Sequence, residues 1–571
     1  MCGIVGFAKS DCLKDTLDAL QLLEYRGYDS AGVAYLGDGE IEVVKRKGSI
    51  EGLRHKVGRK KTDLTIAHTR WATHGKVSTI NAHPHAYGDW AIVHNGIVTN
   101  YASLRADLER RGHVFRSTTD SEVIAHLLQE GGKKGDALAA IRYTMGRIEG
   151  SYAVAALCRY SPNRVYLFKK GNPLVVGKGE GFGCFASDTP ALVAYTHRVY
   201  KMQDGEIAAV GKREILFWRE GETEGGRRTF GTTSLTLSNV TKGDYATYMQ
   251  KEIDEIPSTA DRTYRAYETP PIGWKGAEME RWILVGCGTA YHAALLGASL
   301  CKGEAIVASE FDADAMQVDD KTGVIAISQS GETADTLKAA LDAKSKGWYL
   351  VAVTNVPGSS LTHLADEVLL TLSGAEIGVA ATKSYTTQLA ILARIAEWLG
   401  YRQPTPSPLV PLTSVLSSSA TLAEVAKRRW STIFLLGKGR DYVTCLEGGL
   451  KLKEIAYLHC EVCYAGEIKH GPLALVTRKT LVVVVCTDEE ALQADLCALS
   501  EVRSRGATVA VISPFEELCR AGDHAVRLPD GKGWEQAVGI VPLQQLALWS
   551  ALYKGLDPDR PRNLAKSVTV K

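Results

Sequence analysis

The chain has 571 residues, 45% of them hydrophobic and 23% charged, and its formal net charge at pH 7 is +2. This length is more than one hydrophobic core normally organises, so several domains are expected. The balanced charge gives no electrostatic reason to expect nucleic acid or an anionic membrane as a partner, and no apolar run is long enough to span a bilayer.

The twelve cysteines are scattered without a regular spacing, and no secretory signal opens the chain. Both observations predict reduced thiols in a cytoplasmic protein. Cys460 and Cys463 form one isolated C-x-x-C pair, with no second pair or histidine pair nearby. We interpret them as structural cysteines, with local zinc or redox chemistry as the alternative, and predict no metal site.

Residues 2–240 alternate short apolar stretches with glycine turns, which predicts an α+β layered domain with antiparallel sheets. Strands are expected at 65–69, 90–94 and 152–157, and helices at 13–24 and 121–129. The next segment, 241–275, is polar and helix-prone and carries three prolines, so we expect a linker there.

The second half alternates buried-type strands with helices, which predicts α/β domains with parallel sheets. It also contains a faint internal repeat: three predicted strands, at 281–286, 323–328 and 349–354, are echoed at 431–437, 480–486 and 508–513. A Pro/Ser-rich stretch separates the copies. We therefore predict domains at 276–405 and 406–554, and a polar tail at 555–571 that composition alone would describe as frayed.

The beginning of the chain carries a possible nucleophile. Removal of Met1 would leave Cys2 with a free α-amino group. Such an amine has a pKa of about 7.7–8.0 and a free thiol one of about 8.5, so the amine is a well-matched base for its own thiol. The alternative is that Cys2 is merely a small buried residue at the start of a strand.

Four further residues have the chemistry that an amidase needs. Asn95 and Gly96 follow the predicted strand at 90–93 and could donate hydrogen bonds to an oxyanion. Arg70 could hold a carboxylate, and Asp120 an ammonium group. Each also has a simpler interpretation: a turn for Asn95–Gly96, a surface ion pair for Arg70 and a helix N-cap for Asp120.

Together these positions match a family pattern. The strings CGIVG at 2–6, EYRGYDSAG at 24–32, HTRWATHG at 68–75, NAHPH at 81–85 and HNG at 94–96 resemble those of the N-terminal-nucleophile glutamine amidotransferases. The resemblance is strongest to the glutamine–fructose-6-phosphate aminotransferases. It implies that Cys2 is the nucleophile, with Asn95 and Gly96 at the oxyanion. It also implies a set of glutamine contacts, with the tryptophan gating the ammonia passage: Arg70, Trp71, Thr73, His74 and Asp120.

Nucleotide-binding loops are missing from the second half. Gly286 and Gly288 lack the third glycine of the dinucleotide motif because Tyr291 stands there, and Gly437 and Gly439 are followed by Tyr442 in the same way. No Walker-type loop is present either. The sequence therefore disfavours NAD, FAD and ATP, and we predict no cofactor.

The string SQSGET at 328–333 is a better anion site. It follows a predicted strand and precedes a helix, so backbone N–H groups and hydroxyls could face a phosphate; an imperfect capping box is the alternative. The string resembles the phosphosugar loop of sugar isomerase domains. That resemblance implies a set of sugar-phosphate contacts: Thr289, Ser328, Gln329, Ser330 and Thr333.

Moving a proton between two sugar carbons requires a base. Lys451 and Glu454 are spaced i, i+3, which puts them on one face of a predicted helix. A surface ion pair is the simpler interpretation, whereas a catalytic base would contribute about 10²–10⁴ in rate. His470 lies on a turn-like loop and belongs to the residue type that titrates near neutrality.

Three more strings extend the resemblance to the same aminotransferase family: LKLKEI at 450–455, GEIKHGPL at 466–473 and PRNLAKSVTV at 561–570. The resemblance implies that Lys566 forms a Schiff base with fructose 6-phosphate and that Glu454 shuttles the proton. Lys451 would stabilise the enediol-like oxygen, and His470 would assist ring opening from the neighbouring subunit, which implies a homodimer or larger assembly. The tail would then act as a lid.

Two positions depart from the family pattern. Ala290 and Ala381 stand where many members have serine, so each could lack a hydroxyl contact, while the backbone near Val379 remains available. The expected reaction converts L-glutamine and D-fructose 6-phosphate to L-glutamate and D-glucosamine 6-phosphate. A sister enzyme acting on another keto-sugar phosphate, or a phosphosugar-sensing protein, are the alternatives.

Overall fold

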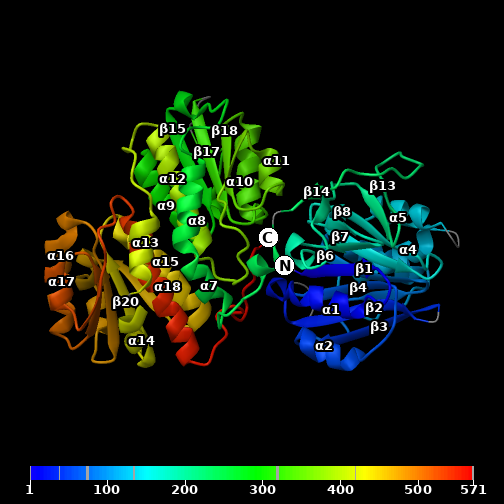
Figure 1. The fold of residues 1–571 in the computed structure, drawn as a ribbon, viewed down its shortest axis with the longest axis horizontal. Coiled ribbons are helices and arrows are strands. Elements are labelled where there is room, and N and C mark those ends of the chain that lie inside the picture. The colour runs from blue at the N-terminus through cyan, green and yellow to red at the C-terminus, as the bar shows by residue number, and fades with distance from the viewer. Residues whose placement is uncertain are drawn as a thin grey trace. The chain divides into compact units, whose positions relative to one another are not determined.

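The computed structural model describes residues 2–37, 39–71, 76–132, 136–233, 235–316, 321–417 and 419–568. The chain divides into two units, the first ending at Thr241 and the second beginning at Lys242. Figure 1 labels the elements of both.

The first unit contains an eight-stranded sheet in the order β14-β11-β9-β10-β1-β4-β2-β3 and a six-stranded sheet in the order β13-β12-β8-β7-β6-β5. Neighbouring strands in both sheets run antiparallel. The strands are β1 (Gly3–Ala8), β2 (Ser30–Gly37), β3 (Glu40–Lys47), β4 (Leu64–Arg70), β5 (His85–Tyr87), β6 (Trp90–Val98), β7 (Gly150–Cys158), β8 (Arg164–Lys170), β9 (Val175–Gly179), β10 (Phe182–Ala186), β11 (Arg198–Lys201), β12 (Ile207–Gly211), β13 (Ile215–Trp218) and β14 (Gly231–Thr232).

The two sheets bury their facing sides against each other, with Ile4 and Ile66 of one packed in the same cluster as Val93 and Ala155 of the other. Helices lie against the outer faces of both sheets (Figure 1). The predicted layered α+β fold with antiparallel sheets is therefore confirmed. The helices of this unit are α1 (Leu13–Gln21), α2 (Ile50–Val57), α3 (Tyr101–Arg110), α4 (Glu122–Gly131), α5 (Ala137–Met145) and α6 (Leu237–Val240).

The strand before Asn95 is longer than predicted. The sequence places Asn95 and Gly96 after a strand, but β6 continues through both of them to Val98 and pairs with β7 over its whole length. Gly96 has φ +129°, and a Cβ there would lie 2.0 Å from the carbonyl oxygen of Ser151. A glycine is therefore what allows β6 to approach β7 at this point.

The second unit contains two parallel five-stranded sheets of the same topology, β16-β15-β17-β18-β19 and β21-β20-β22-β23-β24. The three strand pairs of the predicted repeat occupy equivalent positions in the two sheets, so the predicted α/β domains with parallel sheets are confirmed. The strands are β15 (Arg281–Gly286), β16 (Glu304–Val307), β17 (Thr322–Ser328), β18 (Tyr349–Thr354), β19 (Glu367–Leu370), β20 (Thr432–Gly437), β21 (Cys460–Tyr464), β22 (Thr480–Val485), β23 (Thr508–Ser513) and β24 (His524–Arg527).

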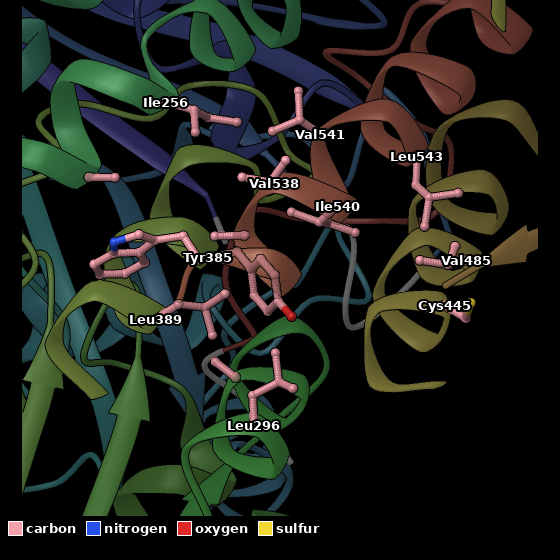
Figure 2. Packing of buried hydrophobic residues seen from close by; sticks show 14 of the residues in the cluster. Ile256, Leu296, Tyr385, Leu389, Cys445, Val485, Val538, Ile540, Val541 and Leu543 are labelled. Carbon is pink, nitrogen blue, oxygen red and sulfur yellow. The ribbon is translucent and has the colours of Figure 1, made fainter. Parts of the chain in front are cut away.

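A single hydrophobic cluster continues from one parallel sheet to the other through the helices between them. Figure 2 shows Tyr385 and Leu296 near Ile540, with Leu543 on the side of Cys445. The helices of the second unit are α7 (Tyr248–Asp254), α8 (Ile256–Ala266), α9 (Thr289–Cys301), α10 (Ala334–Ser345), α11 (Ser360–Leu364), α12 (Lys383–Trp398), α13 (Leu409–Leu416), α14 (Ser419–Lys427), α15 (Arg440–Ala456), α16 (Leu492–Arg503), α17 (Glu516–Ala521) and α18 (Glu535–Tyr553).

Helices α15 and α18 are in close contact. A Cβ on Gly448 of α15 would lie 2.4 Å from Cδ1 of Leu543 on α18. Both helices belong to the second repeat, and they share one hydrophobic cluster with α9 and α12 of the first repeat, so the two repeats form one body.

The segment 241–275 is not an extended connection. It contains α7 and α8, whose Met249, Ile256 and Tyr264 are buried in the core of the second unit. The apolar residues of this segment recur at helical spacing, in keeping with the helix-prone character expected from its sequence.

The tail after α18 is attached to the same body. The carboxylate of Asp559 accepts hydrogen bonds from the backbone N–H groups of Tyr248 and Met249, at 2.8 and 2.9 Å, and lies 3.0 Å from the ammonium of Lys242. The tail therefore holds the first turn of α7 by a buried side chain.

No single helix of the described chain is long and apolar enough to cross a membrane. One bent pair, Leu409–Leu416 with Ala420–Lys427, passes the same test of length and composition.

The Asp559→Ala variant should destabilise the second unit. It removes both acceptors at the start of α7 and leaves buried donors without partners, which costs about 1–3 kcal/mol. We expect a lower denaturant midpoint and faster proteolysis of residues 555–568, measured by fluorescence and mass spectrometry. Asp244→Ala, which alters an exposed carboxylate of the same region, is the matched control; equal midpoints for the two variants would contradict the prediction.

Candidate active sites

Cys2 lies where three segments of the first unit meet. It precedes β1, which pairs with β4 in the register Gly3 to Thr69, so the end of β4 lies beside it. The Cys2 thiol accepts a hydrogen bond from the backbone N–H of Trp71 at 3.3 Å. From the other sheet, Nδ2 of Asn95 donates to the carbonyl oxygen of Cys2 at 2.9 Å.

The thiol of Cys2 is held in its protonated form by its surroundings. Burial raises its pKa, while the Trp71 hydrogen bond and the positive charge of Arg70 act in the opposite direction. Since the net shift is upward, the thiol needs a base before it can act as a nucleophile.

Arg70 and Asp120 are both buried and both act electrostatically on Cys2. Arg70 ends β4, as the sequence predicts. Asp120 accepts a hydrogen bond from the backbone N–H of Val98, at 2.9 Å, and one from the hydroxyl of Ser121, at 3.3 Å. The N-cap of α4 is Ser121, so Asp120 is not the helix cap of the simpler interpretation.

Trp71 is half-buried, and its ring meets that of Tyr28 edge to face with centroids 5.6 Å apart. Thr73 and His74, the other two predicted glutamine contacts, lie outside the described residues.

The loop from Ser328 to Thr333 connects β17 to α10 at the carboxyl edge of the first parallel sheet. The hydroxyl of Ser328 lies 2.9 Å from that of Thr333 and accepts the N–H of Gly331 at 3.1 Å. No side chain caps α10 at its N-cap Thr333, so the loop is not a capping box. A loop that places hydroxyls and a helix start together suits an anion.

Lys451 is fully buried rather than part of a surface pair. Its ammonium lies 2.6 Å from a carboxylate oxygen of Glu454 and 3.2 Å from one of Glu447, and it donates to the hydroxyl of Thr289 at 3.0 Å. Burial alone would lower the pKa of Lys451, but the two carboxylates raise it above its usual value. Lys451 is therefore a cation at neutral pH.

Glu447 is the centre of this network. Its carboxylate is fully buried and also accepts from the hydroxyl of Thr289 at 3.0 Å and pairs with Nδ1 of His292 at 2.7 Å. Burial would raise its pKa, yet the neighbouring Lys451 and His292 lower it. Thr289 and His292 lie on α9 and Glu447 and Lys451 on α15, so the network joins the two repeats.

Lys566 lies in the tail and pairs with the buried carboxylate of Glu376, while its ammonium also donates to the carbonyl oxygen of Gly378 at 2.8 Å. Burial would raise the pKa of Glu376, but the charge of Lys566 and several hydrogen bonds lower it to about 2. Val379 is buried next to this pair, and its N–H donates to the carbonyl oxygen of Asp559 at 3.3 Å.

The tail also touches the phosphosugar loop. The hydroxyls of Ser330 and Ser567 are 2.9 Å apart, and the N–H of Ala334 donates to the carbonyl oxygen of Val568 at 3.1 Å. Lys566 therefore directly precedes the two tail residues that contact the loop. Gln329 is half-buried, and its carbonyl oxygen accepts the N–H of Asn355 at 3.0 Å.

His470 is exposed at the end of a short 3-10 turn, Ala465–Lys469. Within the described part of the chain, it has no side-chain contact with Lys451, Glu454 or Lys566. The structure thus joins Thr289, Lys451 and Glu454 in one network. It also places Lys566 on the tail segment that contacts the Ser328–Thr333 loop, and His470 contacts neither group among the described residues.

Sequence reasoning missed the groups that support the predicted ones: His68, Glu447, His292 and Glu376. Glu447 stands four residues before Lys451, so the same helical spacing that pairs Lys451 with Glu454 could have identified it. The other three have no signal of this kind, because their partners lie on different elements. Among the described residues, no group of three His, Cys, Asp or Glu is arranged to hold a metal ion.

Comparisons with known proteins agree with this arrangement. Residues 70–194 match the glutamine amidotransferase domain family, and residues 277–397 and 428–554 both match the SIS domain family. The solved C-terminal domain of glucosamine-fructose-6-phosphate aminotransferase from Francisella tularensis is 30% identical, covers 56% of this chain and all of its own, and superposes with a TM-score of 0.50.

Two curated relatives match the chain over its entire length. A glutamine–fructose-6-phosphate aminotransferase (isomerizing) of Symbiobacterium thermophilum is 39% identical over 627 aligned positions, and one of Pyrococcus horikoshii is 41% identical over 600. Both alignments cover 100% of this chain and 100% of the relative. The chain therefore belongs to the glutamine–fructose-6-phosphate aminotransferase (isomerizing) family.

Proposed function

We propose that this chain transfers the amide nitrogen of L-glutamine to D-fructose 6-phosphate, giving L-glutamate and D-glucosamine 6-phosphate. The proposal is supported by one observation: the same chain contains a thiol site in its first unit and a hydroxyl-rich loop with lysine and glutamate side chains in its second. The first has a thiol beside an amide donor, Cys2 and Asn95. The second has a hydroxyl-rich loop together with Lys451, Glu454 and Lys566.

In the first unit, Cys2 attacks the side-chain amide of glutamine after Met1 has been removed, and its own α-amine takes the thiol proton. Asn95 and the N–H of Gly96 stabilise the oxyanion. Arg70 holds the substrate carboxylate and Asp120 its ammonium, with Trp71, Thr73 and His74 as further contacts. Ammonia leaves first, and water then releases glutamate from Cys2.

In the second unit, the hydroxyls of the Ser328–Thr333 loop and of Thr289, with the backbone at Val379, bind the sugar phosphate. The amine of Lys566 adds to the C2 carbonyl and water leaves, which forms a Schiff base. Because the product carries a free amino group at C2, ammonia must replace Lys566 there. Glu454 then moves a proton from C1 to C2, and the buried cation Lys451 stabilises the negative oxygen that forms.

Two positions in this unit lack the serine hydroxyl found in many family members. Ala290 is buried at the start of α9, and Ala381 lies just before Thr382, the N-cap of α12. We propose that Thr289 and the backbone near Val379 supply the contacts that these alanines lack.

We also propose that the active form is at least a homodimer. His470 is exposed and makes no contact with Lys451 or Glu454 among the described residues. Ring opening nevertheless requires an acid or a base at the sugar. A second copy of the chain would supply it, and the tail would close as a lid. A cytoplasmic location is supported by the cysteines, all twelve of which are free thiols.

The purified chain should form equal amounts of glutamate and glucosamine 6-phosphate from glutamine and fructose 6-phosphate, measured by chromatography with mass detection. Intact mass should show loss of Met1. Cys2→Ala should abolish both products because it removes the nucleophile. If glutamate forms without glucosamine 6-phosphate, the acceptor is another keto-sugar phosphate, which a substrate panel would identify.

Borohydride reduction in the presence of fructose 6-phosphate should attach one sugar phosphate to the peptide that contains Lys566, because reduction converts the Schiff base to a stable amine. Lys566→Ala should give no adduct, whereas Lys453→Ala, on the exposed side of α15, should label like the parent. Glu454→Gln should still form the adduct but turn over about 10²–10⁴-fold more slowly. Labelling of Lys566→Ala at the parental level would refute the assignment.

Mixing two inactive variants tests the dimer. His470→Ala and Lys566→Ala should each be impaired, yet a mixed dimer has one site with both residues intact. Random reassortment of subunits in a closed dimer should therefore restore about a quarter of parental activity. Mass-verified mixed dimers that recover nothing would show that His470 acts within its own chain.

A further inference from the structure

His68 connects the two sheets of the first unit. It lies on β4 of the eight-stranded sheet, is completely buried and points toward β6 of the six-stranded sheet. Its Nε2 lies 3.0 Å from the backbone carbonyl oxygen of His94 and 3.1 Å from Oδ1 of Asn95. The reaction proposed above assigns no part to His68.

These contacts determine which nitrogen of His68 carries the proton. A backbone carbonyl oxygen only accepts, so Nε2 must donate to His94. Burial lowers the pKa of His68 to about 3, which leaves the ring neutral with this single proton. Nδ1 has no hydrogen-bond partner among the described residues.

The orientation of Asn95 follows from that proton. The Asn95 atom that shares the Nε2–H donor must be an acceptor, so it is the oxygen, and the amide nitrogen faces Cys2. Nδ2 carries two hydrogens. One is donated to the carbonyl oxygen of Cys2 at 2.9 Å, and the other remains for a substrate oxygen.

A second histidine, His83, binds the backbone of the same β6 residue, His94. Nδ1 of His83 accepts the backbone N–H of His94 at 3.1 Å, and the rings of His83 and His68 stack with centroids 4.2 Å apart. Burial lowers the pKa of His83 as well, so this ring is also neutral. Both backbone polar groups of His94, the residue before Asn95, are therefore bound by neutral imidazoles.

We propose that His68 is a positioning residue for the glutaminase step: its Nε2–H holds the amide of Asn95 so that nitrogen, and not oxygen, faces the carbonyl attacked by Cys2. The proposal rests on the proposed glutaminase reaction. The opposite amide orientation would place an oxygen where negative charge develops, which is repulsive, and would remove a donor from the oxyanion.

Two substitutions of His68 separate positioning from packing. A Gln amide nitrogen reaches the place of Nε2, whereas an Asn amide nitrogen reaches only that of Nδ1. His68→Asn should lower kcat for glutamine hydrolysis about 10²-fold, the size of effect seen on losing one oxyanion donor, with KM changed less than about twofold. His68→Gln should recover most of this loss.

The matched control is His126→Asn on α4, since His126 is equally buried but contacts His113 rather than Asn95. It should hydrolyse glutamine at nearly the parental rate. The parent itself tests the proposed function: no glutamine hydrolysis by the parent would refute the glutaminase assignment before any variant is compared.

The affinities for two ligands distinguish a loss of oxyanion binding from a general disturbance of the site, because only one of the ligands places an oxygen at the oxyanion position. The aldehyde carbon of L-glutamate γ-semialdehyde accepts the Cys2 sulfur while the thiol proton moves to the oxygen, so the adduct places an oxygen at the oxyanion position. L-Glutamate binds without that bond. His68→Asn should weaken the semialdehyde about 10²-fold and leave glutamate affinity unchanged. Equal weakening of both ligands, or an unchanged kcat, would overturn the proposal.

Discussion

The buried carboxylate of Glu447 is the interaction on which the second unit depends. It binds Lys451, Thr289 and His292 at 2.7–3.2 Å, with no exposed surface of its own. A buried charge that loses its partner costs about 3–5 kcal/mol, so α9 and α15 cannot slide past each other without breaking the network. Because α9 belongs to the first repeat and α15 to the second, this constraint fixes Lys451 and Glu454 relative to the loop that follows β17.

The sequence predicted the sheets well because strand patterning is local. The parallel strands of the second half are continuous apolar runs, and the repeat of three of them implied two sheets of one topology. The errors occurred where distant contacts decide the structure. No residue near Gly96 indicates that β7 will pair with it. In the same way, the tail is ordered by Asp559, whose partners lie about three hundred residues earlier.

For the sites, the motif strings predicted residues that would touch a substrate, and the structure shows what those residues need around them. Lys566 has Glu376, Lys451 has Glu447, and Asn95 has His68. Each supporting residue comes from a different element or from another turn of the helix. A histidine in a strand is by itself no sign of function, since most buried histidines simply satisfy a neighbour. A role for His68 can be inferred only once its partner Asn95 is known, and the fold is what brings the two residues together.

The two units use opposite electrostatics, and the difference matches the charges that each must handle. Around Cys2, burial lowers the pKa values of His68, His83, His85 and His94, so these rings stay neutral. Arg70 and Asp120 then act on Cys2 with opposite signs, which suits a zwitterionic amino acid. In the second unit, two carboxylates raise the pKa of Lys451 and hold it as a cation, and Lys566 pairs with the buried carboxylate of Glu376. Positive groups of this kind suit a phosphorylated sugar. Exchanging these arrangements would fail in both places. A charged histidine at position 68 would bury a positive charge and carry a proton on Nδ1, which has no acceptor among the described residues. A neutral lysine at 451 would leave Glu447 and Glu454 without their shared counter-charge.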